Sequence, residues 1–94
     1  MSDTTNDQQH NALMDYPCAF TIKTMGLAGS GFEEIALDIV QRHAPEVESS
    51  SIASKLSKTN KFVSLSITLT AKSKQQMDAI YQDLSDCEQV LMSL

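Results

Sequence analysis

Within residues 62–71, apolar side chains and hydroxyl groups alternate strictly from Val63 onward. On an extended chain the apolar residues point to one side (Val63, Leu65, Ile67 and Leu69) and the hydroxyls to the other (Ser64, Ser66, Thr68 and Thr70). Four repeats of this two-residue period, rich in β-branched residues, predict a strand buried on one face and open on the other. The strand expected at residues 62–71 is the best-defined element of the chain.

Three further segments have strand character. They cover residues 18–25, 47–56 and 88–94. The middle segment has few large apolar residues, which is typical of an edge strand. In the last segment, Val90, Met92 and Leu94 are expected to share one side of the strand, because side chains two residues apart do so.

Two segments have the apolar period of an amphipathic helix, at residues 30–43 and 73–84. Each begins with a pattern typical of a capping box, in which a serine is followed three residues later by Glu or Gln. The pairs are Ser30 with Glu33 and Ser73 with Gln76. Proline at position 45 is expected to end the first helix, since the residue before a proline avoids helical geometry.

The predicted order is therefore β-α-β-β-α-β, with a hairpin joining the second and third strands. Right-handed crossovers then give an α+β, ferredoxin-like sandwich: a four-stranded antiparallel sheet with two helices on one face. The opposite face is expected to be polar and nearly uncharged. The residues expected there are Thr21, Lys23, Ser49, Ser51, Ala53, Ser64, Ser66, Thr68 and Thr70.

Composition narrows the function class. The chain has 94 residues, enough for one domain at residues 15–94, and the polar residues 1–14 are predicted to form a disordered tail. The 7 basic and 12 acidic residues give a net charge of −5, which disfavours binding to nucleic acid. The N-terminus has no basic or apolar run, and no segment is apolar enough to span a membrane, so the cytoplasm is expected.

Three stretches together resemble the YbeD-like family of small bacterial proteins. They are Y-P-x-x-F-x-x-K-x-M-G at 16–26, V-Q-R-H-A-P at 40–45 and S-L-S-I-T at 64–68. The resemblance covers residues 15–94 and implies the same ferredoxin-like fold, a structural likeness to ACT-type regulatory domains, and no particular activity. The chain departs from the family at Phe62, where tyrosine is frequent, and at residues 57–61, where a glycine is frequent.

Two places could hold a small ligand. The loop at residues 26–31 leads into a helix N-terminus, where backbone N–H groups can bind an anion or a carboxylate; its candidate residues are Gly26, Gly29, Ser30 and Gly31. ACT-type domains use this loop for amino-acid effectors, although an ordinary strand-to-helix turn explains the same residues. Arg42 and His43, expected in the last helical turn, could contact an anion or only complement the helix dipole.

Catalytic, cofactor and metal sites are not predicted. His43 stands alone, and Cys18 and Cys87 lack metal-ligand spacing; the topology puts the two thiols at opposite ends of neighbouring strands. The first hypothesis is therefore a non-enzymatic regulatory or protein-interaction module, possible interaction residues being Thr21, Lys23, Ser64, Ser66 and Thr68. A homodimer that forms through the same face is an alternative partner arrangement. The alternatives are an ACT-like dimer sensing an amino acid or other carboxylate and, weakest, an enzyme with a site formed on dimerisation.

Overall fold

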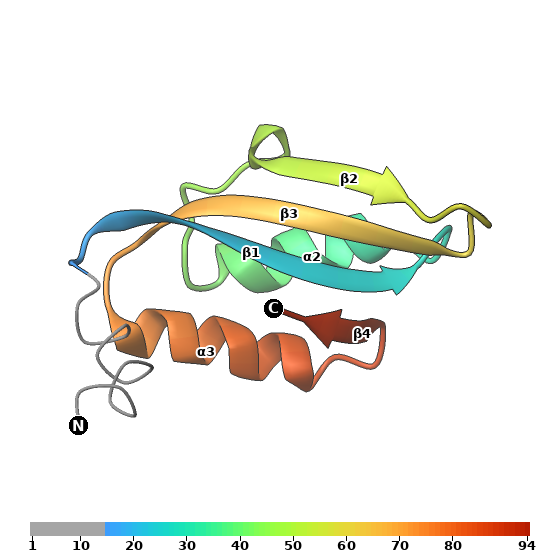
Figure 1. The fold of residues 1–94 in the computed structure, drawn as a ribbon. Coiled ribbons are helices and arrows are strands. Elements are labelled where there is room, and N and C mark those ends of the chain that lie inside the picture. The colour runs from blue at the N-terminus through green and yellow to red at the C-terminus, as the bar shows by residue number, and fades with distance from the viewer. Residues whose placement is uncertain (1–14) are drawn as a thin grey trace, which may run out of the picture.

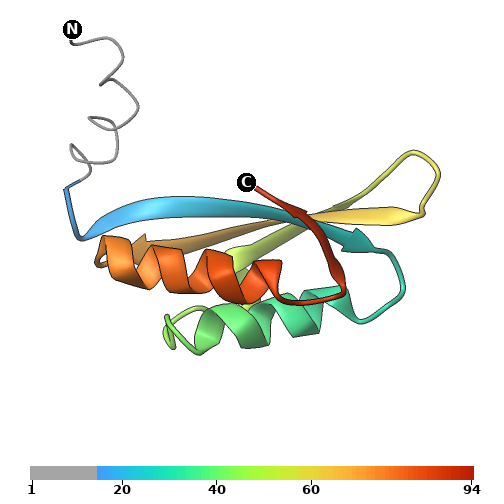
Figure 2. The ribbon, with the colours of Figure 1, turned by 90° about the horizontal axis from the view of Figure 1, so that it is seen from below.

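The four strands form one antiparallel sheet in the order β2-β3-β1-β4, and both helices pack on the same face of it (Figures 1 and 2). The computed structural model describes residues 15–94, so the tail predicted at residues 1–14 lies outside the described part. The elements are β1 (Cys18–Leu27), α2 (Phe32–Gln41), the short 3₁₀ helix η1 (Ser49–Ser51), β2 (Ile52–Leu56), β3 (Phe62–Ala71), α3 (Lys74–Ser85) and β4 (Val90–Ser93). This is the predicted βαββαβ fold, which is confirmed.

The centre of the sheet is the long pair β1 and β3. Their register runs without a break from Cys18 opposite Ala71 to Leu27 opposite Phe62. The sequence predicts both ends of β3 correctly, at residues 62 and 71. It also predicts the buried side of the strand, since Leu65, Ile67 and Leu69 are buried, as is Ala71. We call the sheet face that packs on the helices the covered face and the opposite one the open face.

The core lies between the covered face and the two helices. A row of isoleucines crosses three strands there, with Ile67 of β3 between Ile52 and Ile22. The apolar side chains of the helices complete the core: Phe32, Ala36, Ile39 and Val40 from α2, and Met77, Ile80 and Leu84 from α3. The stripes predicted from helical spacing also include Ile35, His43 and Tyr81, which are only partly buried.

The two predicted capping boxes have different outcomes. At α3 the Ser73 hydroxyl accepts a hydrogen bond from the Gln76 backbone N–H (3.0 Å), while the Gln76 side chain accepts from the Lys72 N–H (2.6 Å). At α2 the box predicted on Ser30 is wrong. Gly31 occupies the N-cap in left-handed geometry (φ 76°), and the Ser30 hydroxyl instead donates to the Leu27 carbonyl (2.7 Å).

The second strand is shorter than predicted. Residues 49–51 form η1, and β2 begins only at Ile52, so Ser49 and Ser51 are not part of the sheet and do not lie on its open face. These three consecutive serines provide no large side chain for the core, so nothing holds them in extended geometry. The first helix is also shorter: α2 ends at Gln41, which places Arg42 at its C-cap and His43 just beyond it.

The last strand differs from the prediction in the direction of its side chains. A bulge interrupts the pairing of β4 with β1, so that Val90 lies opposite Gly26 but Met92 lies opposite Met25. Val90 therefore packs toward the core, whereas Met92 and Leu94 are exposed. The expectation that these three residues share one side is wrong, because the extra residue Leu91 reverses the alternation.

Candidate functional site

The open face carries two rows of side chains that cross all four strands near the end where β4 pairs with β1. The first row is Lys55, Ser64, Met25 and Met92, and the second is Ala53, Ser66, Lys23 and Leu94. Leu94 joins its row through paired backbone hydrogen bonds with Lys23, of 3.0 and 2.6 Å. Along the first row the surface changes from charged to hydroxyl to apolar.

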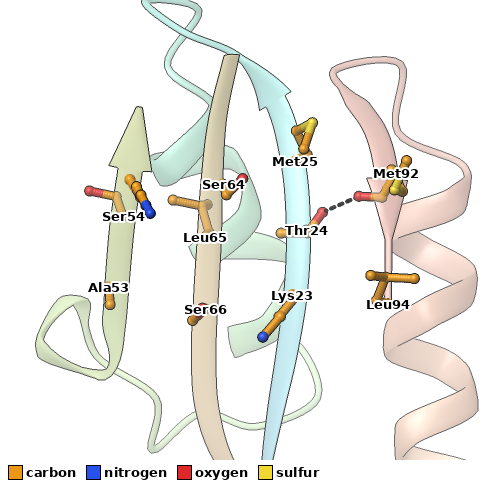
Figure 3. Close-up of a pocket in the computed structure, with 11 residues that line it drawn as sticks. Lys23, Thr24, Met25, Ala53, Ser54, Ser64, Leu65, Ser66, Met92 and Leu94 are labelled. Atoms are coloured by element: carbon orange, nitrogen blue, oxygen red, sulfur yellow. Dashed lines mark hydrogen bonds between the residues drawn. The ribbon is translucent and has the colours of Figure 1, made fainter. Parts of the chain in front are cut away.

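These two rows line a hollow of about 460 Å³ on the open face (Figure 3). Hydroxyls and a small side chain form its floor, from Ser64, Ser66 and Ala53. Met92 and Leu94 form an apolar wall along β4, and these two side chains are 53% and 71% exposed. The hollow is thus a shallow amphipathic surface with an apolar edge.

Polar contacts hold that apolar wall in place. The Thr24 hydroxyl donates to the Met92 carbonyl at 3.1 Å and lies 3.0 Å from the Ser93 hydroxyl, and the first of these bonds is drawn in Figure 3. From α3 the Tyr81 hydroxyl donates to the Leu94 carbonyl at 2.9 Å. Burial raises the pKa of Tyr81, which keeps the proton on the hydroxyl and so preserves the donor.

Charge is divided between the two layers. The four strands contain only two charged residues, Lys23 and Lys55, and both lie on the open face. Among residues 15–94 neither lysine makes an ion pair. The helical layer is acidic instead, and its cations are engaged: Arg42 pairs with Asp38 and Lys74 pairs with Asp78, whose hydrogen bond and charge raise the pKa of Lys74.

The glycine loop has the geometry of a tight turn more than that of an anion site. Gly26 is buried against Phe32, and a Cβ on it would lie 2.6 Å from the ring. Gly29 and Gly31 have positive φ angles of 78° and 76°. Glu33 and Glu34 occupy the first turn of α2, where their charges complement the helix dipole and would repel an incoming anion.

Arg42 and His43 lie at the other end of α2, away from the glycine loop. His43 Nε2 lies 2.6 Å from Asp83 Oδ2, and the His43 carbonyl accepts from the Gln76 side chain at 2.8 Å. These contacts join the end of α2 to α3. The structure therefore brings Arg42 and His43 together with carboxylates of the helical layer and with neither the loop nor the open face.

All five residues that the sequence predicts as an interaction face lie together on the open face. They are Thr21, Lys23, Ser64, Ser66 and Thr68, and the Thr21 and Thr68 hydroxyls are 3.3 Å apart. Sequence reasoning missed the apolar wall and Lys55. Met25 follows Lys23 by two residues, so the alternation of β1 could have placed it on this face. Nothing in the sequence of β4 marks the bulge that separates Val90, which packs toward the core, from Met92 and Leu94 on the open face.

Within residues 15–94 no three His, Cys, Asp or Glu side chains are grouped as metal ligands would be. None of the helices there is long and apolar enough to cross a membrane. Cys18 and Cys87 are free thiols, and the register places Cys18 at the Ala71 end of the sheet and Cys87 beyond its other end.

Comparison with known proteins places the chain in a family. Residues 11–94 match the family described as "Protein of unknown function (DUF493)". The UPF0250 protein of Ectopseudomonas mendocina is 35% identical over 82 residues (86% of this chain, 89% of the relative), and that of Nitrosomonas europaea is 37% identical over 83 residues (88% and 95%). The UPF0250 protein of Vibrio parahaemolyticus is 35% identical over the whole of both chains.

A solved structure shows the same fold at low sequence identity. The solution structure of protein HP0495 from H. pylori matches with a TM-score of 0.75 and 17% identity, covering 100% of this chain and 93% of that one. Identity that low supports the fold alone. The extended matches to UPF0250 proteins confirm the resemblance to small YbeD-like bacterial proteins. The chain therefore belongs to the DUF493 family.

Proposed function

We propose that this protein acts in the cytoplasm as a non-enzymatic regulatory module that docks a partner protein on the open face of its sheet. The observation that carries the proposal is the apolar wall of Met92 and Leu94, which stands exposed beside a floor of small hydroxyl side chains. A wall of this kind is the feature that protein-binding surfaces use as a hydrophobic centre.

The energetics of this surface favour association. Fully burying an exposed methionine or leucine side chain contributes about 1.5–3 kcal/mol, and Met92 and Leu94, which are 53% and 71% exposed, would gain part of that range. The flexible thioether of methionine also adapts to partners of different shape. The floor contributes little, but its hydroxyls cost less to remove from water than lysine or glutamate would. The helical layer also has a hollow, but five of the eight side chains that line it are charged, namely Glu34, Asp38, Arg42, Asp83 and Asp86. Such groups cost more to remove from water than the hydroxyls of the open face.

Site-specific photo-crosslinking in the native bacterium tests the proposal. A photoreactive amino acid replaces Ser66 on the open face or, as the matched control, the exposed Gln75 on α3. We expect a discrete adduct of higher mass from position 66 and none from position 75. Equal labelling from both positions, or none from position 66, would contradict the proposal. An adduct of twice the monomer mass would identify the partner as a second copy.

The size of the hollow favours a second candidate function, the sensing of a small carboxylate effector as in ACT-type domains. A volume of about 460 Å³ lies within the range of small-molecule sites, and Lys23 and Lys55 could pair with a carboxylate above the hydroxyl floor. In this version the ligand binds on the open face and not at the glycine loop.

A thermal shift screen against amino acids and small organic acids separates the two candidates. A ligand at 100 times its Kd stabilises a protein by about 2.7 kcal/mol, which raises Tm by roughly 10–20 °C for a domain this small. A shift that disappears in a Lys23→Ala variant would support effector sensing. If no compound shifts Tm and position 66 still gives an adduct, only the protein-docking function remains supported.

A further inference from the structure

The two lysines of the open face have no partner that the described fold supplies. Lys23 is on β1 and Lys55 on β2, and Ser64 and Ser66 of β3 lie between them in the two rows. No carboxylate side chain stands within ion-pair distance of either lysine among residues 15–94, whereas three other basic side chains there, Arg42, His43 and Lys74, each lie beside an aspartate. The charged side chains of the open face, among the described residues, are therefore both positive.

The opposite layer presents an excess of negative charge. Glu33, Glu34 and Asp38 lie on α2, and Asp78 and Asp83 lie on α3. An acidic partner would be repelled there, and it would be attracted to the open face. Complementary charge of this kind selects and orients partners more than it adds affinity.

The apolar wall and the lysines lie a fixed distance apart. From Lys55 to Met92 the first row crosses three gaps between strands, which amounts to about 14 Å at roughly 4.8 Å per gap. Lys23 and Leu94 are direct neighbours in the second row. A segment lying across the strands would meet positive charge over β2 and β1 and apolar surface over β4.

A second copy of this chain fits the face poorly. Two open faces packed against each other would bring lysines together, because the four strands contain no acidic residue to oppose them. The acidic helices of a second copy could reach the open face only in a head-to-tail arrangement, which does not close on itself and leads to chains of molecules. The charge pattern thus favours a different protein.

We infer that the partner segment is acidic and amphipathic, with carboxylates opposite Lys23 and Lys55 and large apolar side chains opposite Met92 and Leu94. This inference rests on the proposed function, since it names the chemistry of the partner that docks on the same face. The affinity for the partner segment should then fall as the salt concentration rises, because salt screens the charge pairs.

A displayed library of random 16-residue peptides, selected against the full-length protein, supplies the probe. Selected peptides are expected to be enriched in Asp and Glu together with Leu, Ile, Phe or Met. Synthetic copies of them should bind the double variant Lys23→Glu with Lys55→Glu about ten-fold more weakly or worse, since the attractive pairs become repulsive. The matched control, Lys58→Glu with Lys72→Glu, has the same net charge but alters no residue of the hollow, and it should bind as the unaltered protein does.

A third variant, Met92→Ser with Leu94→Ser, makes the outcomes distinguishable. All substituted positions are exposed, and thermal melts verify that each variant is folded. If selected peptides lack acidic enrichment and weaken only with the Met92 and Leu94 variant, the inference is overturned and the proposed docking function stands. If selected peptides bind all three variants equally, the open face is not the docking site and both are overturned.

Discussion

β3 and β4 differ in what fixes their side chains to one face of the sheet. β3 has ten residues, lies between two strands and alternates buried and exposed side chains almost throughout. β4 has four residues, lies at the sheet edge and pairs with β1 through a bulge. The register of β3 is therefore fixed by its own buried residues, whereas that of β4 depends on polar contacts from Thr24 and Tyr81. Of these two strands, β4 is held less by the core, and it provides the apolar wall of the candidate site.

The largest effect is expected from removing a buried side chain of β3. Ile67 is fully buried between Ile22 and Ile52, so Ile67→Ala loses apolar contact and leaves a cavity. We expect a loss of about 2–5 kcal/mol in the free energy of unfolding, or roughly 10–30 °C in Tm. Thermal and urea unfolding measure it. A loss below about 1 kcal/mol would show that burial does not hold β3 in register.

The next effect is expected at the bulge, from Gly26→Ala. A Cβ at this position would lie 2.6 Å from two carbons of the Phe32 ring and 2.8 Å from the Gln89 carbonyl, so the ring or the turn before β4 must shift. We expect a loss of about 1–3 kcal/mol by overpacking, seen in urea unfolding. Gly29→Ala is the control, because open space surrounds it and only its positive φ is strained, at roughly 1 kcal/mol. An equal or larger loss from the control would contradict the steric account.

A smaller and more local effect is expected from Thr24→Val. The substitution keeps the shape of a buried side chain but removes the hydroxyl that bonds the Met92 carbonyl and the Ser93 hydroxyl. We expect a loss of about 1–2 kcal/mol, together with faster hydrogen exchange of the Leu94 amide, which bonds the Lys23 carbonyl. The Ile67 amide in β3 serves as the internal reference. Unchanged exchange at Leu94 would mean that Thr24 does not hold β4.

The contrast between β3 and β4 also explains which parts of the structure the sequence predicts. Where buried side chains dictate the conformation, as in β3 and in the helical stripes, pattern and structure agree. The pattern fails where backbone geometry decides. Gly31 in left-handed geometry takes the N-cap that Ser30 was expected to fill, and the bulge at Leu91 reverses the sides of Met92 and Leu94.

The candidate site divides in the same way. Its polar part, including Lys23 and Ser66, lies on strands whose alternation is regular and is placed on the open face from sequence. Its apolar wall comes from β4, where alternation predicts one shared side for Val90, Met92 and Leu94 and the bulge separates them. The bulge forms where β4 pairs with β1, and this pairing joins residues more than sixty positions apart, such as Thr24 and Ser93. The residues next to the bulge in the sequence therefore do not predict it.

The smallest effect on stability is expected from Ser66→Ala, one residue away from Ile67 on the same strand. Ser66 faces the hollow and makes no side-chain hydrogen bond among the described residues, so the free energy of unfolding should change by less than about 0.5 kcal/mol. Replacing Ser66 with Glu should be similarly tolerated in the melt, yet it places a carboxylate beside Lys23 and should weaken binding of acidic peptides. A variant that leaves unfolding unchanged and alters binding would show that the open side of β3 is shaped by its partner, just as its covered side is shaped by the core. A large loss of stability from Ser66→Ala would instead mean that both sides of β3 serve the fold.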